Sequence, residues 1–378
     1  MLARTARIIR PRAWQLPARA QGAPAGALVL TRTVFGLLLA GICALAETLQ
    51  AQSNGSGGQP PAAEAPYPPV PSIPAIGVQN TNYLHVPASA LGPSVDPAKG
   101  YRRQDLGQGL YMVTDNIYQS MFLVYDHGVV VIDAPPSYAP RIPQAIAEVT
   151  TKPITHVIYS HSHTDHIGGT RSLGGRPIIV AQEETLRLLK RAADPNRPLP
   201  TVTFADRYTL RVGEQVLELS YHGDAHEPGN IFIYAPAQKV LMAVDLVFPG
   251  WMMWRRFAVA HDIPGVFAQV EEIRKMPWQT FVGGHVARTG THADVDVQAE
   301  FMGDVKQAAA AALATTKPGE GTDPRDAANP WALFDNYIDR VATKCVNALV
   351  PKWATRLAAF DVYVWDQCFA MEQSLRID

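Results

Sequence analysis

The sequence is short of cysteine and of excess charge, and histidine is scarce outside one short segment. Its 378 residues include three cysteines, which are too few for a disulfide framework. The formal net charge at pH 7 is -1 and no long run of like charges occurs, so a nucleic-acid-binding surface is not expected. Hydrophobic residues make up 47% of the chain, which is enough for a substantial core in one large or two smaller domains. Histidine occurs 11 times, so any cluster of histidines is informative.

Acidic residues are absent from the first 32 positions, which contain several arginines. The uncharged run VFGLLLAGICALA follows at residues 34–46 and ends in small residues. This arrangement is typical of a secretory signal peptide, whereas a transmembrane helix needs about 20 apolar residues. We therefore expect residues 1–46 to be a cleaved signal peptide of an exported protein, periplasmic or secreted, with no stable membrane span after cleavage. A single membrane anchor and a start site placed too early are the alternatives.

The rest of the chain divides by composition into three parts. Residues 47–98 are rich in Pro, Ala, Gly and Ser, which predicts a disordered or polyproline-like linker. In residues 99–295, β-rich stretches alternate with helices in two successive halves, which predicts two packed sheets with helices outside. Residues 296–378 predict a C-terminal helical extension, which would either cover the substrate entrance or make a homodimer contact. Its Cys345 and Cys368 would form a disulfide or remain two buried thiols.

Three histidines and an aspartate fall within residues 161–166, in the motif HSHTDH, directly after the apolar run ITHVIYS. His161 and His163 are two positions apart at the end of a predicted strand, so their side chains can leave it on the same side. Asp165 and His166 follow in a predicted loop that leads into a helix near Ile167. One short segment can therefore direct two histidines to one point and an Asp-His pair to a neighbouring point.

Three further ionisable residues, His226, Asp245 and His285, each follow an apolar strand. An ionisable side chain where a buried strand ends is costly unless it is paired or bound to metal. Each residue alone would be an ordinary loop residue or turn cap, but together with HSHTDH they predict a metal site. All the donors are imidazoles or carboxylates, which suits zinc, and iron or manganese could also bind.

Five motifs occur in order between roughly Gly107 and His285: VVVIDAP, HSHTDH, GDAHEPGN, VLMAVD and VGGH. In these motifs the sequence resembles the metallo-β-lactamase-fold hydrolases. The resemblance implies an α/β fold, an αββα sandwich with its site at one edge of the two sheets. It also implies two metal ions with the following ligands: His161, His163 and His226 for one, Asp165, His166 and His285 for the other, and Asp245 as a bridge. Asp133 would support the ligand loop without binding metal.

Two close metal ions lower the pKa of a shared water and stabilise the oxyanion that forms when the resulting hydroxide attacks. We therefore expect a dinuclear zinc hydrolase that cleaves an ester, lactone or related acyl bond of a small molecule, with Asp165 as the catalytic proton carrier. The bridging Asp245 looks more like the lactonases and glyoxalase II-type thioesterases than like the true β-lactamases of this fold. A β-lactamase and an iron-dependent persulfide dioxygenase-like oxygenase are the alternatives, and His163 weighs against the second.

The segment FPGWMMWRRF at residues 248–257 follows the bridging aspartate. It would be either a packed core loop or an apolar wall beside the metals. In the second case Trp251 and Trp254 would contact the substrate, and Arg255 or Arg256 would meet an anionic group on it.

Overall fold

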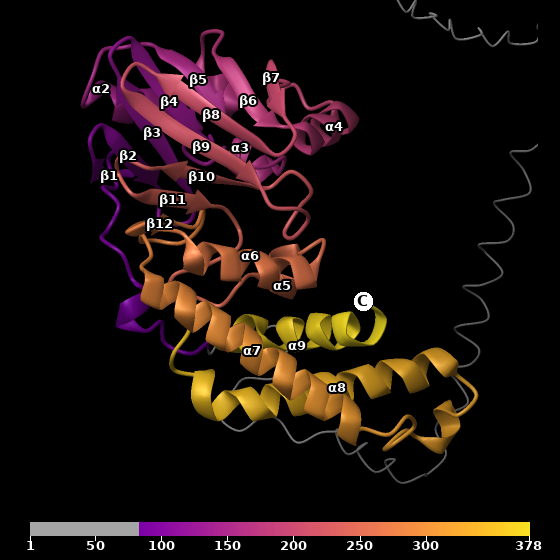
Figure 1. The fold of residues 1–378 in the computed structure, drawn as a ribbon. Coiled ribbons are helices and arrows are strands. Elements are labelled where there is room, and N and C mark those ends of the chain that lie inside the picture. The colour runs from indigo at the N-terminus through magenta and orange to yellow at the C-terminus, as the bar shows by residue number, and fades with distance from the viewer. Residues whose placement is uncertain (1–82) are drawn as a thin grey trace, which may run out of the picture. The chain divides into compact units, whose positions relative to one another are not determined.

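The structure, a computed structural model, describes residues 83–378, and the strands of this part form two β-sheets. In the first sheet β1 to β7 lie side by side in chain order, and in the second the order is β12-β11-β10-β9-β8 (Figure 1). The strands of the first sheet are β1 (Arg102–Gly107), β2 (Leu110–Thr114), β3 (Gln119–Tyr125), β4 (Gly128–Ile132), β5 (Ile154–Ile158), β6 (Ile178–Gln182) and β7 (Val202–Phe204). Those of the second are β8 (Arg207–Val212), β9 (Gln215–Tyr221), β10 (Ile231–Ala235), β11 (Val240–Ala243) and β12 (Thr280–Val282).

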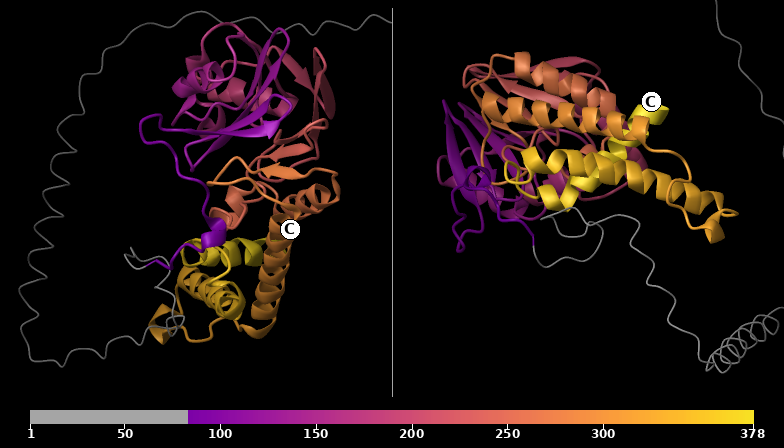
Figure 2. Two further views of the ribbon diagram at one scale, coloured as in Figure 1. Left: turned by 90° about the vertical axis from the view of Figure 1, so that its left-hand side faces the viewer. Right: turned by 90° about the horizontal axis from the view of Figure 1, so that it is seen from below.

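Helices cover the outer faces of both sheets. The helices between strands are α2 (Ile142–Ala147), α3 (Thr164–Ile167), α4 (Glu183–Ala192), α5 (Arg255–Val259) and α6 (Ile263–Lys275). The C-terminal helices are α7 (His292–Thr315), α8 (Pro330–Trp353) and α9 (Phe360–Ile377), which pack on one another in all three views (Figures 1 and 2). Within residues 83–378, none of the helices combines the length and the apolar character that crossing a membrane requires.

Three apolar clusters hold these layers together. The cluster between the sheets contains inward side chains from both, such as Val130 and Ile132 of β4 and Leu217 and Leu219 of β9. The alternate residues of β4, Val129 and Val131, pack outward against α2 and its neighbours. All the side chains of β4 are apolar, and both faces of this strand are buried. β4 pairs with β5 in parallel, and strands of parallel sheets are usually buried on both faces. The predicted αββα sandwich with a C-terminal helical region is confirmed.

The C-terminal helices share the third cluster with the second sheet. Phe232 of β10 and Leu241 of β11 belong to the same buried cluster as Phe301 of α7 and Phe360 of α9. The predicted boundary at residues 295/296 falls inside α7, which begins at His292 with Thr291 as its N-cap. Cys345 of α8 and Cys368 of α9 form a disulfide, which was one of the two alternatives for these cysteines.

The last part of the predicted linker packs against the folded body. The backbone N–H of Leu84 donates to Asp361 of α9, and the carbonyls of Ser89 and Ala90 accept from Arg288 and Trp251. The prediction of a disordered linker was therefore wrong for residues 83–98, because backbone groups make these contacts and composition does not reveal them. The predicted signal peptide, 1–46, and the rest of the linker, 47–82, lie outside the described residues.

Two details of the strands cannot be read from the sequence. The stretch TVTFADRYTLRVG, residues 201–213, contains β7 at the edge of the first sheet and β8 at the edge of the second. β1 has little of the apolar alternation typical of a strand, because its sequence, RRQDLG, is polar and mostly half-exposed. Alternation along a strand predicts which side chains face inward, but it does not say to which sheet the strand belongs.

Helix α5 is a left-handed turn. Four consecutive residues, Arg256 to Val259, have φ between 50° and 59°. Its hydrogen bonds run from Ala258 N to Trp254 O and from Ala260 N to Arg256 O. Left-handed backbone is costly for residues with a Cβ, and this turn contains no glycine.

Glu148, at the end of α2, connects that helix to the start of the first sheet. Its carboxylate accepts from Lys99 Nζ at 2.7 Å, from Tyr101 Oη at 2.8 Å and from Arg103 Nε at 3.2 Å. Lys99 first, with Tyr101 and Arg103, lowers the pKa of Glu148 to about 2 against the opposing effect of partial burial. A pKa lowered in the folded state contributes stability above the unfolded pKa, and that stability is lost as the pH falls through the folded pKa.

We predict that Glu148→Gln lowers the free energy of unfolding by about 1 kcal/mol at pH 7, the scale of a partly exposed ion-pair network. The difference from wild type should shrink as the pH falls from the ordinary value of 4.5 toward about 2, where the wild-type carboxylate becomes protonated. Urea unfolding at several pH values measures it. A difference that is independent of pH would contradict the role of charge.

Candidate metal centre

Seven histidine and aspartate side chains meet where strands of both sheets end. His161 and His163 follow β5, and Asp165 and His166 lie in the short helix α3, where a loop was predicted. His226 lies between β9 and β10, Asp245 follows β11 and His285 follows β12. All seven predicted positions are brought together, in two groups whose donor atoms lie within 4.8 Å of one another.

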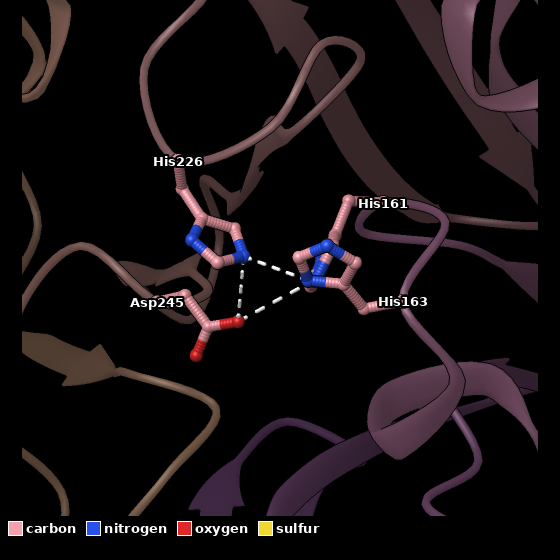
Figure 3. Close-up of side chains that lie close together, drawn as sticks. All are labelled: His161, His163, His226 and Asp245. Atoms are coloured by element: carbon pink, nitrogen blue, oxygen red, sulfur yellow. Dashed lines mark hydrogen bonds and ion pairs between the residues drawn. The ribbon is translucent and has the colours of Figure 1, made fainter. Parts of the chain in front are cut away.

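The first group consists of His161, His163, His226 and Asp245 (Figure 3). The Nε2 of His226 lies 2.9 Å from the Nδ1 of His163 and 3.1 Å from Asp245 Oδ2. The Nε2 of His161 lies 3.5 Å from the same oxygen. Four donors from three segments, which follow β5, β9 and β11, therefore point at a common centre.

The second group consists of Asp165, His166 and His285. The Nε2 atoms of His166 and His285 are 3.0 Å apart, and Asp165 Oδ2 lies 3.6 and 3.8 Å from them. Asp245 reaches this group too, with Oδ2 3.2 Å from His166 and Oδ1 2.9 Å from His285. Asp245 is thus shared by both groups.

The donor geometry fits metal ions. Two ligands about 2.1 Å from a tetrahedral ion lie about 3.4 Å apart, close to the distances seen within each group. His161 Nε2 is buried and has no hydrogen-bond partner among the described residues. A buried polar atom without a partner is costly, and a cation at the first centre would satisfy it.

Burial and neighbouring charges set the protonation of the cluster. Burial, together with the surrounding imidazoles, lowers the pKa of His161 well below its usual value, so this ligand is neutral. Burial alone would raise the pKa of Asp245, but His166, His285 and His226 hold it well below its usual range. Burial also opposes the charge on His166, yet Asp245 and Asp165 raise its pKa to about 9. Metal binding must therefore release protons from the cluster.

Three of the histidines contact a further protein group through their other ring nitrogen. His161 Nδ1 lies 2.9 Å from Ser160 Oγ, and His226 Nδ1 donates to Ala258 O at 2.7 Å. His163 Nε2 lies 3.2 Å from Glu227 Oε1. Such contacts orient an imidazole and fix which nitrogen is free to bind metal.

Glu227 is a site residue that the sequence analysis missed. Besides His163, its carboxylate accepts from the backbone N–H and the hydroxyl of Ser162, at 3.0 and 2.9 Å. Ser162 lies between two of the predicted ligands, so Glu227 ties the loop that follows β9 to the loop that follows β5. Its position directly after His226 in GDAHEPGN was the available signal.

Asp133 lies at the end of β4, beneath the ligand loop. It is fully buried, and its Oδ1 accepts from the backbone N–H of Ser160 at 2.8 Å. Burial raises the pKa of Asp133 to about 6, against the lowering effects of His166 and Ser160. The structure thus places Asp133 where it supports the ligand loop.

A cavity of about 740 Å³ opens onto the cluster, and apolar atoms form most of its surface. Its walls come from the loop after β11, from the left-handed turn and from the start of α9, and include Trp251, Trp254, Val259, Val362 and Tyr363. Trp251 is fixed there by Ala90, whose carbonyl accepts from its indole at 2.9 Å. Among the described residues, no lysine or arginine lines this cavity.

The prediction that Arg255 or Arg256 meets an anionic substrate was wrong. Arg255 pairs with Asp366 of α9 at 3.0 Å, and the Arg256 guanidinium lies 5.4 Å from the ring centre of Phe369. The side chains of Arg255 and Arg256 therefore contact α9. In the same left-handed turn, Ala258 and Val259 line the cavity.

Other polar residues near the motifs have structural contacts. Tyr159 donates to the carbonyl of Pro198, and His222 stacks on Phe232. Arg288 pairs with Asp294 at 2.6 Å.

Comparisons with known proteins agree with this arrangement. The family model of the metallo-beta-lactamase superfamily matches residues 114–310. The 2,4-dinitroanisole O-demethylase subunit alpha of Nocardioides sp. (strain JS1661) is 26% identical over 194 residues, which cover 47% of this chain and 56% of that protein. A metallo-beta-lactamase type 2 of Elizabethkingia meningoseptica is 26% identical over 136 residues, 35% of this chain and 53% of the relative. A metallo-beta-lactamase type 2 of Bacillus sp. (strain 170) is 30% identical over 127 residues, which cover 32% of this chain and 47% of the relative.

The chain spans about half the length of the curated relatives that it matches. Among solved structures, a metallo-beta-lactamase from Pontibacter korlensis is similar with a TM-score of 0.46 and 20% identity, covering 53% of this chain and 97% of that one. The family match, together with the His/Asp cluster, implies that the protein binds a divalent metal.

We predict that Glu227→Gln weakens metal binding by about 10- to 100-fold, the usual effect of removing a carboxylate that orients a ligand histidine. Competition with a chromogenic chelator measures the affinity. Glu214→Gln, at the exposed turn between β8 and β9, serves as the matched control and should bind metal like wild type. Equal affinities for the two variants would show that Glu227 does not position His163.

Proposed function

Because the chain belongs to the metallo-beta-lactamase superfamily, we propose that it is a dinuclear zinc hydrolase that cleaves an ester, lactone or related acyl bond in an uncharged, largely apolar small molecule. The position of Asp245 is the observation that carries this proposal. Its two carboxylate oxygens lie within 3.2 Å of His226, His166 and His285, which belong to both ligand groups. A carboxylate shared in this way supports two metal ions at a short separation.

When bound, such a pair of ions supplies activated water and polarises an acyl carbonyl. The two carboxylates of the cluster differ in what they can do. The side chain of Asp245 is 5% exposed and is surrounded by imidazoles, so it can only hold its neighbours in place. The side chain of Asp165 is 42% exposed and faces the cavity, so it can accept a proton from water and return it to the leaving group.

The cavity supports the choice of substrate class. Away from the metal ions, an anionic group on the substrate would lose its hydration in a largely apolar cavity without gaining a lysine or arginine partner there. The aromatic walls formed by Phe248, Trp251 and Tyr363 suit an aryl or long acyl group. One relative is named for 2,4-dinitroanisole, an uncharged aryl compound, which is in keeping with this preference.

β-Lactam hydrolysis is the second candidate function. It is favoured by the names of two of the relatives, which are type 2 metallo-beta-lactamases. The shared Asp245 weighs against it, since the true β-lactamases of this fold are expected to carry another residue there. Because the matches cover about a third of this chain, they do not decide the substrate.

A substrate panel on zinc-loaded protein tests the function. We expect two zinc ions per chain, turnover of neutral aryl esters or lactones, and little turnover of nitrocefin. His161→Ala should lose metal and activity together, because this ligand is completely buried and cannot be replaced by solvent. His127→Ala, in the exposed turn between β3 and β4, is the matched control.

Other outcomes of this panel would overturn the proposal. Nitrocefin as the best substrate would identify the second candidate. One equivalent of iron with oxygen uptake would indicate an oxygenase. Hydrolysis that survives in His161→Ala would place the active site elsewhere.

A second prediction concerns the wall formed by α9. Val362→Trp should fill part of the cavity and raise KM for substrates with a bulky acyl group by about tenfold, which corresponds to about 1.4 kcal/mol. Metal content should be unchanged, because Val362 touches the cavity and not the cluster's donor atoms. Leu375→Trp, near the exposed end of the same helix, is the control. Unchanged KM values for large and small substrates alike would show that α9 does not contact the substrate.

A further inference from the structure

The orientation of the His226 imidazole depends on one backbone carbonyl. Nδ1 of His226 lies 2.7 Å from Ala258 O. A carbonyl can only accept, so Nδ1 must carry the proton. In the neutral imidazole this leaves Nε2 free to bind metal, and Nε2 is directed at the cluster, 2.9 Å from His163 Nδ1 and 3.1 Å from Asp245 Oδ2. The carbonyl of Ala258 therefore selects both the tautomer and the direction of this ligand.

Ala258 belongs to the left-handed turn, which does not sustain its own conformation. Arg256, Phe257, Ala258 and Val259 all have positive φ, and none of them is glycine. Such a backbone persists only where its surroundings over-determine it. The direction of the Ala258 carbonyl is thus set by whatever holds the turn.

The side chain of Gln367, from α9, holds the turn. It is completely buried. Its Oε1 accepts from the backbone N–H of Phe257 at 2.7 Å, and its Nε2 donates to the carbonyls of Met253 and Trp254 at 2.7 and 2.9 Å. The carboxamide of Gln367 thus makes three hydrogen bonds, one as acceptor and two as donor, all to backbone groups of residues 253–257.

Neighbouring residues of α9 add to this hold. Asp366 pairs with Arg255 at 3.0 Å, and Phe369 lies beneath the guanidinium of Arg256. Cys368, next to Gln367, is bonded to Cys345 of α8, so α9 is itself anchored. The contacts run without a gap from α9 to the turn and from the turn to His226.

We propose that Gln367 is a positioning residue for the metal centre, which sets the His226 imidazole through the left-handed turn and the carbonyl of Ala258. This inference requires divalent metal binding by the cluster, and it holds for any substrate. The C-terminal helical extension then determines the strength of metal binding and does not only cover the sheets.

Gln367→Met tests the proposal, because methionine is of similar length and removes all three hydrogen bonds. We expect zinc affinity to fall by about 10- to 100-fold, as for the loss of other contacts that orient a ligand. The visible absorption spectrum of the cobalt-substituted protein should change as well, because it reports the ligand geometry. Gln298→Met, another buried glutamine, on α7, is the matched control. It should bind zinc and cobalt like wild type, even if it is less stable.

A double-mutant cycle separates positioning from general destabilisation. In a His226→Ala background, Gln367→Met should cause no further loss of zinc affinity, since the ligand through which it acts is gone. An equal further loss in that background would overturn the proposal, as would wild-type affinity and an unchanged cobalt spectrum in the single variant.

Gln367→Asn covers the case in which the methionine variant does not fold. It keeps a neutral amide, but it is one methylene shorter and cannot keep all three hydrogen bonds. A smaller loss of zinc affinity is expected for it, and wild-type affinity in this variant would also contradict the proposal.

Discussion

The arrangement of the site depends on the burial of one carboxylate, that of Asp245. Burying an unpaired carboxylate costs several kcal/mol, so its oxygens must meet cationic or metal-bound partners. Histidines from three loops supply them, which requires the ends of β5, β9, β11 and β12 to converge. The VGGH motif allows this approach: a Cβ on Gly284 would lie 2.5 Å from a methyl carbon of Val244, and one on Gly283 would lie 2.4 Å from Val247 O. These glycines bring the β12 end close enough for His285 to reach Asp245.

Around this carboxylate, orientation is supplied from several directions. Ser160, Glu227 and Ala258 each contact the far side of one imidazole, and they come from three different loops. His166 Nδ1 is buried without such a partner among the described residues. The His161, His163 and His226 rings are therefore constrained from both sides, whereas His166 is held by its helix and by packing.

The sequence predicts those site residues that are ionisable and directly follow an apolar strand. His226 and Asp245 were accessible because an ionisable residue after an apolar strand needs a partner, and several strands end in this way. Glu227 was missed because a glutamate in a polar loop carries no such signal. Arg255 and Arg256 were placed wrongly because their directions depend on a left-handed turn without glycine. The contacts of residues 83–98 could not be predicted either, because they are made by backbone groups and amino-acid composition describes only side chains.

The left-handed turn also explains why the C-terminal helices do not form a separate domain. Left-handed backbone costs roughly 1–2 kcal/mol per residue, and the turn contains four such residues in succession. Burial of Phe257, which is completely inaccessible, recovers about 1.5–3 kcal/mol and does so only against the apolar cluster shared by α6, α7, α8 and α9. The hydrogen bonds to α9 must offset the remainder. The conformation of this turn beside the cavity therefore depends on the helices behind it, which share one apolar cluster with the second sheet.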